Sequence, residues 1–205
     1  MTDYKFTPTR TFNGCIEIYE NIWDNSEETI SLIENECSDT TSIMEWSLAD
    51  VRKDGYESVN ATRTNLHTGI TYYAEKGNKS AQKLHNKIAN LLVPLLEEYM
   101  YRYRILGIQY HHEFYNMLKY SNNQKFDAHV DGLPGSDRFL SCVLYLNDNY
   151  IGGELEFVNF DLKLKMPKAS LIVFPSNYSH AHIAHPVTSG IKYAIVAWLA
   201  LNNQG

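Results

Sequence analysis

The segment KFDAHVDG, residues 125–132, places a histidine and an aspartate two positions apart, at His129 and Asp131. On an extended backbone, residues i and i+2 point to the same side, so the imidazole and the carboxylate could hold one metal ion. The same pair could equally be two solvated side chains near a strand end, because a pattern this short arises often by chance. A metal site therefore needs a third ligand from elsewhere in the chain.

Three histidines near the C-terminus are candidates for that third ligand: His180, His182 and His185. Two imidazoles and one carboxylate form the facial triad typical of non-heme Fe(II) oxygenases. His180 and His182 have the same parity on an extended strand, so spacing alone does not separate them, whereas His185 has the opposite parity and should point away. Zinc also accepts histidine and carboxylate ligands, so the donor types leave the metal open.

The candidate ligands lie in a strand-rich part of the chain. From residue 104 onward, apolar residues recur with a period of two in short segments separated by Asn, Asp, Gly and Pro. This pattern predicts a β-sandwich or barrel. The expected strands are two in ILGIQYHHEFYNMLKY and one in each of RFLSCVLYLND, GELEFVN, LKLKMP, ASLIVFP, AHIAHPV and KYAIVAWLAL.

The N-terminal half carries the helical patterns. A strand is expected at 15–23, followed by a helix over 24–39, and the strongest apolar stripe predicts a helix over 80–102. Pro94 lies inside this last helix and should kink or divide it. Residues 39–79 are polar and weakly patterned, which predicts a mobile surface loop or lid with one short strand at 69–74.

Composition excludes several classes of protein. The chain has 205 residues, enough for one domain, and a formal net charge of −6 without a basic cluster, which disfavours nucleic-acid and anionic-membrane partners. Its three cysteines are widely spaced and form no C-x-x-C motif, which indicates reduced thiols. The polar N-terminus and the lack of a long apolar run predict a soluble, cytoplasmic protein, either a monomer or a homodimer.

Three segments together resemble the prolyl 4-hydroxylase family of Fe(II)- and 2-oxoglutarate-dependent dioxygenases: HVDG, CVLYLNDNYIGGELEF and FPSNYSHAHIAHPVTSGIKYAIVAW. The similarity runs over residues 110–199, and ATRTN at 61–65 weakly resembles the loop that precedes the family's core. The resemblance implies an α+β fold, a double-stranded β-helix (jelly roll) with supporting N-terminal helices. It also implies one dioxygenase domain over 1–205, with helical support and lid loops in 1–103 and the jelly roll in 104–205.

The resemblance further implies which residues bind the metal. His129 and Asp131 match the family's H-x-D pair. The family's distal histidine lies four residues before the Pro-Val of HPVTSG, which selects His182. Fe(II) would then be held by one carboxylate and two imidazoles, with 2-oxoglutarate and O2 as cosubstrates and ascorbate as the reductant that keeps the iron in the Fe(II) state.

For 2-oxoglutarate, Lys192 matches the family's cation for the distal carboxylate and Tyr145 its hydrogen-bonding tyrosine, while Tyr120 would line the pocket. Without the resemblance, the lysine would be read as an outward residue at a strand start and the tyrosine as core. Three further residues resemble substrate-side residues of the family: Arg63, Arg138 and Trp198. The two arginines could equally be solvated surface charges, and the tryptophan could equally fill the core.

The function that the resemblance implies is hydroxylation of an unactivated C–H bond, with release of succinate and CO2. Peptidyl proline in a peptide or protein is the favoured substrate. A hydroxylase of a free amino acid or another small molecule is the first alternative, and a non-catalytic metal-binding jelly-roll interaction module is the second. Nucleic-acid demethylases of the superfamily generally carry a second arginine on the last strand, and KYAIVAWLAL has none.

Overall fold

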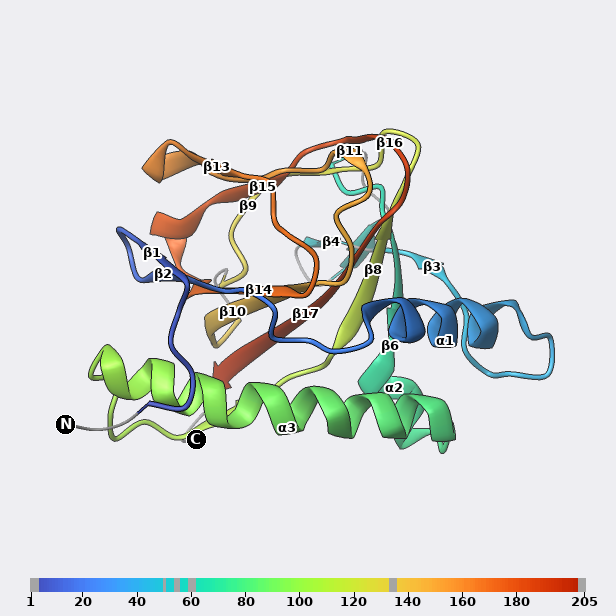
Figure 1. Ribbon diagram of the computed structural model, residues 1–205, viewed down its shortest axis with the longest axis horizontal. Coiled ribbons are helices and arrows are strands. Elements are labelled where there is room, and N and C mark those ends of the chain that lie inside the picture. Colours follow the sequence, from blue (N-terminus) through green and yellow to red (C-terminus); the bar gives the residue numbers. More distant parts are fainter. Residues whose placement is uncertain (1–3, 50, 54–55, 59–61, 133–135, 203–205) are drawn as a thin grey trace.

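The computed structural model describes residues 4–49, 51–53, 56–58, 62–132 and 136–202, and its largest element is an antiparallel sheet of nine strands (Figure 1). Neighbours in this major sheet follow the order β1-β2-β14-β10-β17-β8-β6-β3, and β7 pairs with the end of β17. The strands are β1 (Arg10–Phe12), β2 (Ile16–Tyr19), β3 (Ser47–Leu48), β6 (Leu66–Gly69), β7 (Tyr110–His112), β8 (Asn116–Tyr120), β10 (Arg138–Tyr145), β14 (Ser170–Pro175) and β17 (Lys192–Leu201).

A minor sheet of four strands, ordered β13-β12-β15-β9, encloses the interior with the major sheet. Apolar side chains of both sheets share one buried cluster, so the two sheets close around a common core. This confirms the predicted α+β jelly-roll fold. The remaining elements are β9 (Phe126–His129), β12 (Leu155–Phe157), β13 (Leu162–Leu164), β15 (His182–Ala184), the pairs β4 (Val51–Lys53) with β5 (Tyr56–Ser58) and β11 (Ile151–Gly152) with β16 (Val187–Ser189), and the short 3-10 turns η1 (Val158–Phe160) and η2 (Tyr178–His180).

The major sheet serves two cores, because alternate residues of a strand face opposite sides. One face packs on the helices and the other lines the jelly-roll interior. On β17, Ile195 and Ala197 belong to the helix-side core, whereas Val196 and Trp198 belong to an interior cluster. Lys192 has the same parity as Val196 and Trp198, so the strand itself directs this lysine into the interior.

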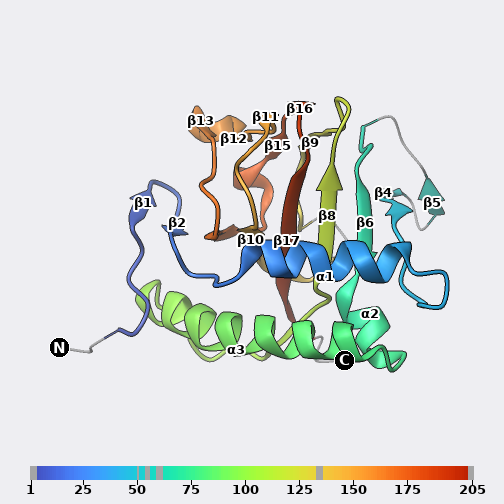
Figure 2. The same cartoon turned by 45° about the vertical axis from the view of Figure 1, so that its right-hand side comes forward.

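Three helices in the described residues support the outer face of the major sheet: α1 (Ser26–Ser38), α2 (Ile70–Glu75) and α3 (Lys79–Arg102). Figure 2 shows α1 lying across the strands and α3 running beneath them. The predicted apolar stripe of α3 is buried in the helix-side core. None of these helices combines the length and apolarity that a membrane crossing requires.

Pro94 does not divide α3, which continues as one helix of 24 residues. A proline removes one backbone hydrogen bond to the residue four positions earlier. Here that residue is Asn90, which is exposed, so its carbonyl can be solvated. The packing of Leu92, Leu95 and Leu96 on the sheet holds the helix through this break.

The strand predicted at 69–74 is wrong, because this segment forms α2. Ile70, Thr71 and Ala74 are buried while Tyr72 is exposed, a helical rather than an alternating pattern. The predicted mobile loop over 39–79 is likewise wrong for residues 66–75, since β6 pairs with β8 inside the major sheet. Residues 50, 54–55 and 59–61, which fall in the predicted lid and in ATRTN, lie outside the described residues.

Strands from the N-terminal part extend the sheet at both ends. The hairpin of β1 and β2 adds to β14, and β6 with β3 adds to β8. The expected division between helical support and jelly roll at 103/104 therefore does not separate helices from sheet. The interior remains formed mainly by strands after residue 104. Each segment expected to form a strand there does so, whereas β9, β11 and β16 lie outside the expected list.

Candidate active site

Neighbouring strands of the minor sheet bring the H-x-D pair and a distal histidine together. β9 ends at His129, and β15 begins at His182, which is the direct pairing partner of His129 in the antiparallel register. Asp131 follows two residues after His129. One potential ligand atom from each of these three side chains lies within 4.8 Å of the others. The structure therefore assembles the two imidazoles and the carboxylate that the sequence singles out.

Backbone carbonyls fix the orientation of both imidazoles. Nδ1 of His129 lies 2.8 Å from the carbonyl of Asp127, and Nδ1 of His182 lies 3.0 Å from the carbonyl of His180. A carbonyl oxygen only accepts, so each Nδ1 carries the hydrogen and each Nε2 keeps its lone pair. Both Nε2 atoms face Asp131, at 3.7 Å from Oδ1 and 3.9 Å from Oδ2. Metal-binding histidines use this arrangement of an outer hydrogen bond and an inward lone pair.

Asp131 is held by a chain of hydroxyl groups. The Ser141 hydroxyl donates to Oδ2 of Asp131 at 2.6 Å, and Oγ of Ser141 lies 2.7 Å from Oγ of Ser176. Because the single hydroxyl hydrogen of Ser141 is used on the carboxylate, Ser176 donates to Ser141. This chain of hydroxyl donors orients the carboxylate toward the two imidazoles.

Charge and burial set the protonation states of His129 and Asp131. Burial and the nearby His182 lower the pKa of His129 to about 3, against the opposing effect of Asp131. Burial alone would raise the pKa of Asp131, but the two imidazoles outweigh it, aided by hydrogen bonds from Ser141 and Trp198, so the pKa lies below its ordinary value. Near neutral pH, the site offers a neutral imidazole and an ionised carboxylate, the forms that bind metal.

Gly132 lets the chain turn tightly after the carboxylate. Its amide donates to the carbonyl of Ser176 at 2.8 Å. A Cβ at this position would stand 2.8 Å from the carbonyl oxygen of Arg138 and 2.9 Å from that of Ser176, closer than side-chain carbons approach backbone oxygens. The glycine of HVDG is therefore required by close backbone packing beside Asp131.

The other two C-terminal histidines are engaged elsewhere. Nε2 of His180 lies 2.6 Å from the carbonyl of Gly14, which ties η2 to the turn between β1 and β2. His185 points to the outer side of the minor sheet and pairs with Glu156 at 2.6 Å. The parity argument correctly predicts that His185 points away, but it could not separate His180 from His182. The 3-10 turn that ends at His180 makes that distinction.

The donor set fits iron. It consists of two imidazole nitrogens and one carboxylate oxygen, the facial arrangement that non-heme Fe(II) oxygenases use. Apolar rings surround it: Phe126 stacks on His129 with ring centroids 3.4 Å apart, and Phe174 meets His182 edge-on at 5.0 Å. Such a shell limits the access of water to the three ligand atoms.

Lys192 lies deep in the same interior and is only 2% exposed. Its ammonium donates to the carbonyl of Gly153 at 2.9 Å, and no carboxylate in the described residues forms an ion pair with it. Burial, with a contribution from Lys165, lowers its pKa to about 7. A buried ammonium with one hydrogen-bond partner is costly unless an anion joins it. The site therefore has the character of an anion pocket.

Two tyrosine rings flank the Lys192 ammonium. The ring centroids of Tyr120 and Tyr145 lie 5.1 Å and 5.0 Å from Nζ. Burial raises the pKa of both phenols, with Asp131 acting in the same direction on Tyr120. Tyr120 therefore lies beside the lysine and within electrostatic reach of Asp131, so the two polar centres share the interior of the jelly roll.

The predicted substrate-side residues form two stacks beside the triad. Arg63 lies over the Phe126 ring at 4.7 Å, and this ring stacks in turn on His129. Arg138 lies over the Trp198 ring at 3.8 Å, and the indole hydrogen-bonds Asp131. Arg138 also pairs with a glutamate that sequence reasoning missed, Glu113, at 2.7 Å.

Sequence reasoning also missed Ser141 and Phe126. Ser141 could have been found from strand parity, because it alternates with Cys142 on an apolar strand. Phe126 is three residues before His129, so strand parity gives no signal for its contact with that imidazole. Their contacts with the triad, however, depend on pairing between strands that are distant in the chain.

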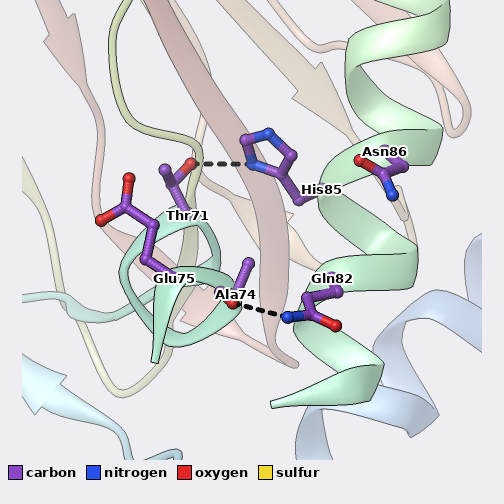
Figure 3. A pocket seen from close by; sticks show the side chains of 6 residues that line it. All are labelled: Thr71, Ala74, Glu75, Gln82, His85 and Asn86. Atoms are coloured by element: carbon purple, nitrogen blue, oxygen red, sulfur yellow. Dashed lines mark hydrogen bonds between the residues drawn. The ribbon is translucent and has the colours of Figure 1, made fainter. Parts of the chain in front are cut away.

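A separate hollow of about 290 Å³ lies between α2 and α3 (Figure 3). Both helices pack on the helix-side face of the major sheet, away from the jelly-roll interior. Thr71 bonds His85 and Gln82 bonds the carbonyl of Ala74 across the hollow. These two hydrogen bonds join α2 to α3.

Comparisons with known proteins agree with this geometry. The model of the 2OG-Fe(II) oxygenase superfamily matches residues 115–200. A PKHD-type hydroxylase of Prochlorococcus marinus (strain MIT 9301) is 29% identical over 181 residues, which are 85% of this chain and 74% of that protein. The superfamily's Fe(II) and 2-oxoglutarate suit the His-Asp-His site and the anion pocket.

Two solved structures show the same fold. The viral collagen prolyl hydroxylase of Paramecium Bursaria Chlorella virus-1, in its 2OG complex, is 19% identical with a TM-score of 0.62, covering 91% of this chain and 96% of that one. A prolyl hydroxylase from Trichoplax adhaerens, in complex with a hypoxia inducible factor oxygen degradation domain peptide fragment, is 17% identical with a TM-score of 0.70, covering 92% and 84%.

Proposed function

We propose that this chain, which is a prolyl 4-hydroxylase-like 2OG-Fe(II) oxygenase, hydroxylates a prolyl residue of a peptide or protein and releases succinate and CO2. Its cofactor and cosubstrates are Fe(II), 2-oxoglutarate and O2. The observation that carries the proposal is the pairing of two centres in one interior. A triad of metal-binding character lies at one end, and a buried ammonium that lacks an anionic partner in the described residues lies at the other.

In the proposed mechanism, His129, Asp131 and His182 hold the iron through their inward ligand atoms. Iron bound there supplies the activation of O2 that oxidises 2-oxoglutarate and the target C–H bond. The chain contributes orientation: carbonyl acceptors fix both imidazoles, and hydroxyl donors fix the carboxylate. The surrounding aromatic rings exclude water, so that the oxidation is directed to the bound substrate.

The other end of the pocket selects the cosubstrate. Lys192 pairs with the distal carboxylate of 2-oxoglutarate, which supplies the missing anion, and Tyr145 and Tyr120 pack along the ligand. Pairing stabilises the charged ammonium and so opposes the effect of burial on its pKa. The lysine and the triad together set the direction in which 2-oxoglutarate lies, with its 2-oxo acid end toward the metal ligands.

The substrate enters between the two arginine–aromatic stacks. Arg63 on Phe126 and Arg138 on Trp198 place rigid planar surfaces beside His129 and Asp131. Such surfaces bind a peptide backbone and a proline ring with little loss of side-chain freedom. The peptide bound to the Trichoplax prolyl hydroxylase, a protein of the same fold, supports a peptide over a free amino acid.

We further propose that residues 1–205 act as one domain, because β1, β2, β3 and β6 complete the sheet that carries the site. A cytoplasmic setting is supported by the free thiols of Cys15, Cys37 and Cys142. The net charge of −6 supports neither a nucleic acid nor an anionic membrane as partner, and either a monomer or a homodimer accommodates the site.

The test is a panel of proline-containing peptides, free proline and other free amino acids, incubated with the full chain, Fe(II), 2-oxoglutarate and ascorbate. We expect a 2-oxoglutarate-dependent gain of one oxygen atom in peptides and stoichiometric succinate. The Asp131→Ala variant serves as the inactive control. Oxygen gain on free amino acids alone would replace the peptide proposal by the small-molecule one, and no turnover of 2-oxoglutarate with any compound would contradict the enzymatic proposal.

A further inference from the structure

The phenol of Tyr150 is a buried polar group that the site described so far does not use. Tyr150 is 6% exposed, and its hydroxyl oxygen is buried without a hydrogen-bond partner in the described residues. A buried hydroxyl that forms no hydrogen bond is destabilising, which is why such groups usually have a partner. An unpartnered phenol in this interior therefore points to a ligand that is present when the protein works.

The ring of Tyr150 lies beside the residue that accepts the hydrogen bond from Lys192. Tyr150 belongs to the interior cluster that contains Tyr120 and Val196. One edge of its ring lies against Gly153, where an added Cβ would stand 2.8 Å from Cε2 of Tyr150. The carbonyl of this same Gly153 accepts the hydrogen bond from Lys192. Tyr150 and the ammonium are thus neighbours of one residue.

Electrostatic coupling agrees with this placement. After burial, Tyr150 is the largest influence that raises the pKa of Tyr145, ahead of Tyr120. The Tyr145 ring centroid in turn lies 5.0 Å from Nζ of Lys192. A ligand carboxylate on Lys192 would therefore lie among these aromatic residues.

Lys165 fixes the ring from its other side. Its Nζ lies 3.3 Å from the Tyr150 ring centroid and donates to the carbonyls of Tyr150 at 2.9 Å and Gly152 at 2.7 Å. A cation on the ring face and two hydrogen bonds to the adjoining backbone hold this aromatic side chain in one orientation. Lys165 is accordingly a positioning residue for Tyr150.

The geometry points to Tyr150 as an additional binding residue whose hydroxyl donates a hydrogen bond to the distal carboxylate of the 2-oxo acid, beside Lys192. This inference rests on the proposed function, because it takes 2-oxoglutarate as the anion in the pocket. It explains why the phenol has no internal acceptor: the acceptor arrives with the ligand. The pocket then selects a dicarboxylate through one ammonium and one rigidly held phenol.

The test compares Tyr150→Phe with the wild-type chain, both loaded with Mn²⁺, by calorimetric titration. The two titrants are 2-oxoglutarate and 2-oxopentanoate, which has a methyl group in place of the distal carboxylate. We expect the Kd for 2-oxoglutarate to rise about tenfold, the usual effect of one hydrogen bond to a charged group, and the Kd for 2-oxopentanoate to stay unchanged. Tyr193→Phe is the matched control, since this phenol lies on the helix side of β17 and donates to Glu34 at 2.6 Å.

Thermal unfolding without metal or ligand adds a second readout. Tyr150→Phe removes an unsatisfied hydroxyl, so its Tm should equal the wild-type value or exceed it, whereas Tyr193→Phe should lower Tm without changing the Kd for 2-oxoglutarate. An unchanged Kd for 2-oxoglutarate in Tyr150→Phe, or an equal rise for both titrants, would overturn the role of Tyr150 while leaving the proposed function intact. If the wild-type chain binds no 2-oxoglutarate, the proposed function and this inference both fail.

Discussion

The protein buries charge in two places, and the two places are built differently. Beneath the major sheet, Glu17 is 2% exposed and accepts from Arg102 at 2.9 Å, from Tyr103 at 3.1 Å and from Tyr19. Inside the jelly roll, Lys192 is equally buried but donates to a single backbone carbonyl. The acid has its counter-ion within the chain, and the base has none among the described residues.

The difference separates a structural charge from a functional one. Arg102 lies in the last turn of α3 and Glu17 in β2, so their ion pair joins the long helix to the second strand of the major sheet. The network is complete in the ligand-free chain, and its contribution is to stability. In the same state the Lys192 ammonium lacks an anionic partner among the described residues. A buried charge without a partner indicates that an anionic ligand binds there.

The largest effect is expected from breaking the complete network. Arg102→Met leaves the Glu17 carboxylate buried without its cation, which should lower the free energy of unfolding by about 3–5 kcal/mol. Urea denaturation measures this loss. The affinity of the folded variant for 2-oxoglutarate should match the wild type, and a loss of stability well under 1 kcal/mol would show that the network is not structural.

Lys192→Met should give the opposite pattern. Removal of one partner from a buried charge pair costs about 3–5 kcal/mol, so the Kd for 2-oxoglutarate should rise at least ~100-fold. The ligand-free variant should be as stable as the wild type or more stable, because a costly buried ammonium is gone. Calorimetry and urea denaturation of the same sample check both parts, and weak binding together with strong destabilisation would assign Lys192 to the scaffold.

Ser141→Ala tests the hydroxyl chain at the other end of the pocket. Without the Ser141 donor, Asp131 loses orientation and one influence that lowers its pKa. Loss of such an outer hydrogen bond typically weakens metal affinity by about 10- to 100-fold. Competition with a chelator for Mn²⁺ measures it. Ser176→Ala, one hydroxyl further from Asp131, should have a smaller effect, and the reverse order would contradict the directed chain.

The smallest effect is expected at the hydrogen-bonded pair of His185 and Glu156, which is partly exposed. His185 and Glu156 are both partly exposed, and exposed pairs contribute about 0–1 kcal/mol. His185→Ala should retain nearly full turnover and stability, whereas His182→Ala should lose turnover. Loss of activity in His185→Ala, measured by succinate release, would place this histidine in the site after all.

Local patterns predicted much of the fold. The period of two located most strands after residue 104, though not β9, β11 or β16, and the apolar stripe located α3, because both patterns depend on neighbouring residues. The segment 69–74 was mispredicted because Ile70, Tyr72 and Tyr73 favour a strand locally, while burial of Thr71 and Ala74 against the fold selects a helix. Entry of β6 into the major sheet also depends on β8, almost fifty residues away.

Prediction of the site followed the same division. H-x-D spacing and strand parity oriented His129, Asp131 and His185, and the family resemblance supplied His182 and Lys192. The contacts of Arg138 with Glu113 and of Ser141 with Asp131 arise from strand register, which a single sequence does not state. The sequence gives no sign that the Tyr150 hydroxyl lacks a hydrogen-bond partner, because this depends on which side chains surround it in the fold.

The most direct measurement of the central claim is an NMR titration of the Lys192 side chain in two samples. The first is the chain without metal or ligand, and the second is the chain loaded with diamagnetic Zn²⁺ and 2-oxoglutarate. Burial lowers the pKa of Lys192 to about 7 in the ligand-free protein, below its ordinary value of 10.5. Between these values the unfolded chain binds more protons, so the contribution of Lys192 to stability should rise with pH across that window. An arriving carboxylate favours the ammonium, so 2-oxoglutarate should move the midpoint upward, and its affinity should fall as pH rises above about 7. An ordinary midpoint in the free protein, or a midpoint that 2-oxoglutarate leaves unchanged, would contradict the account.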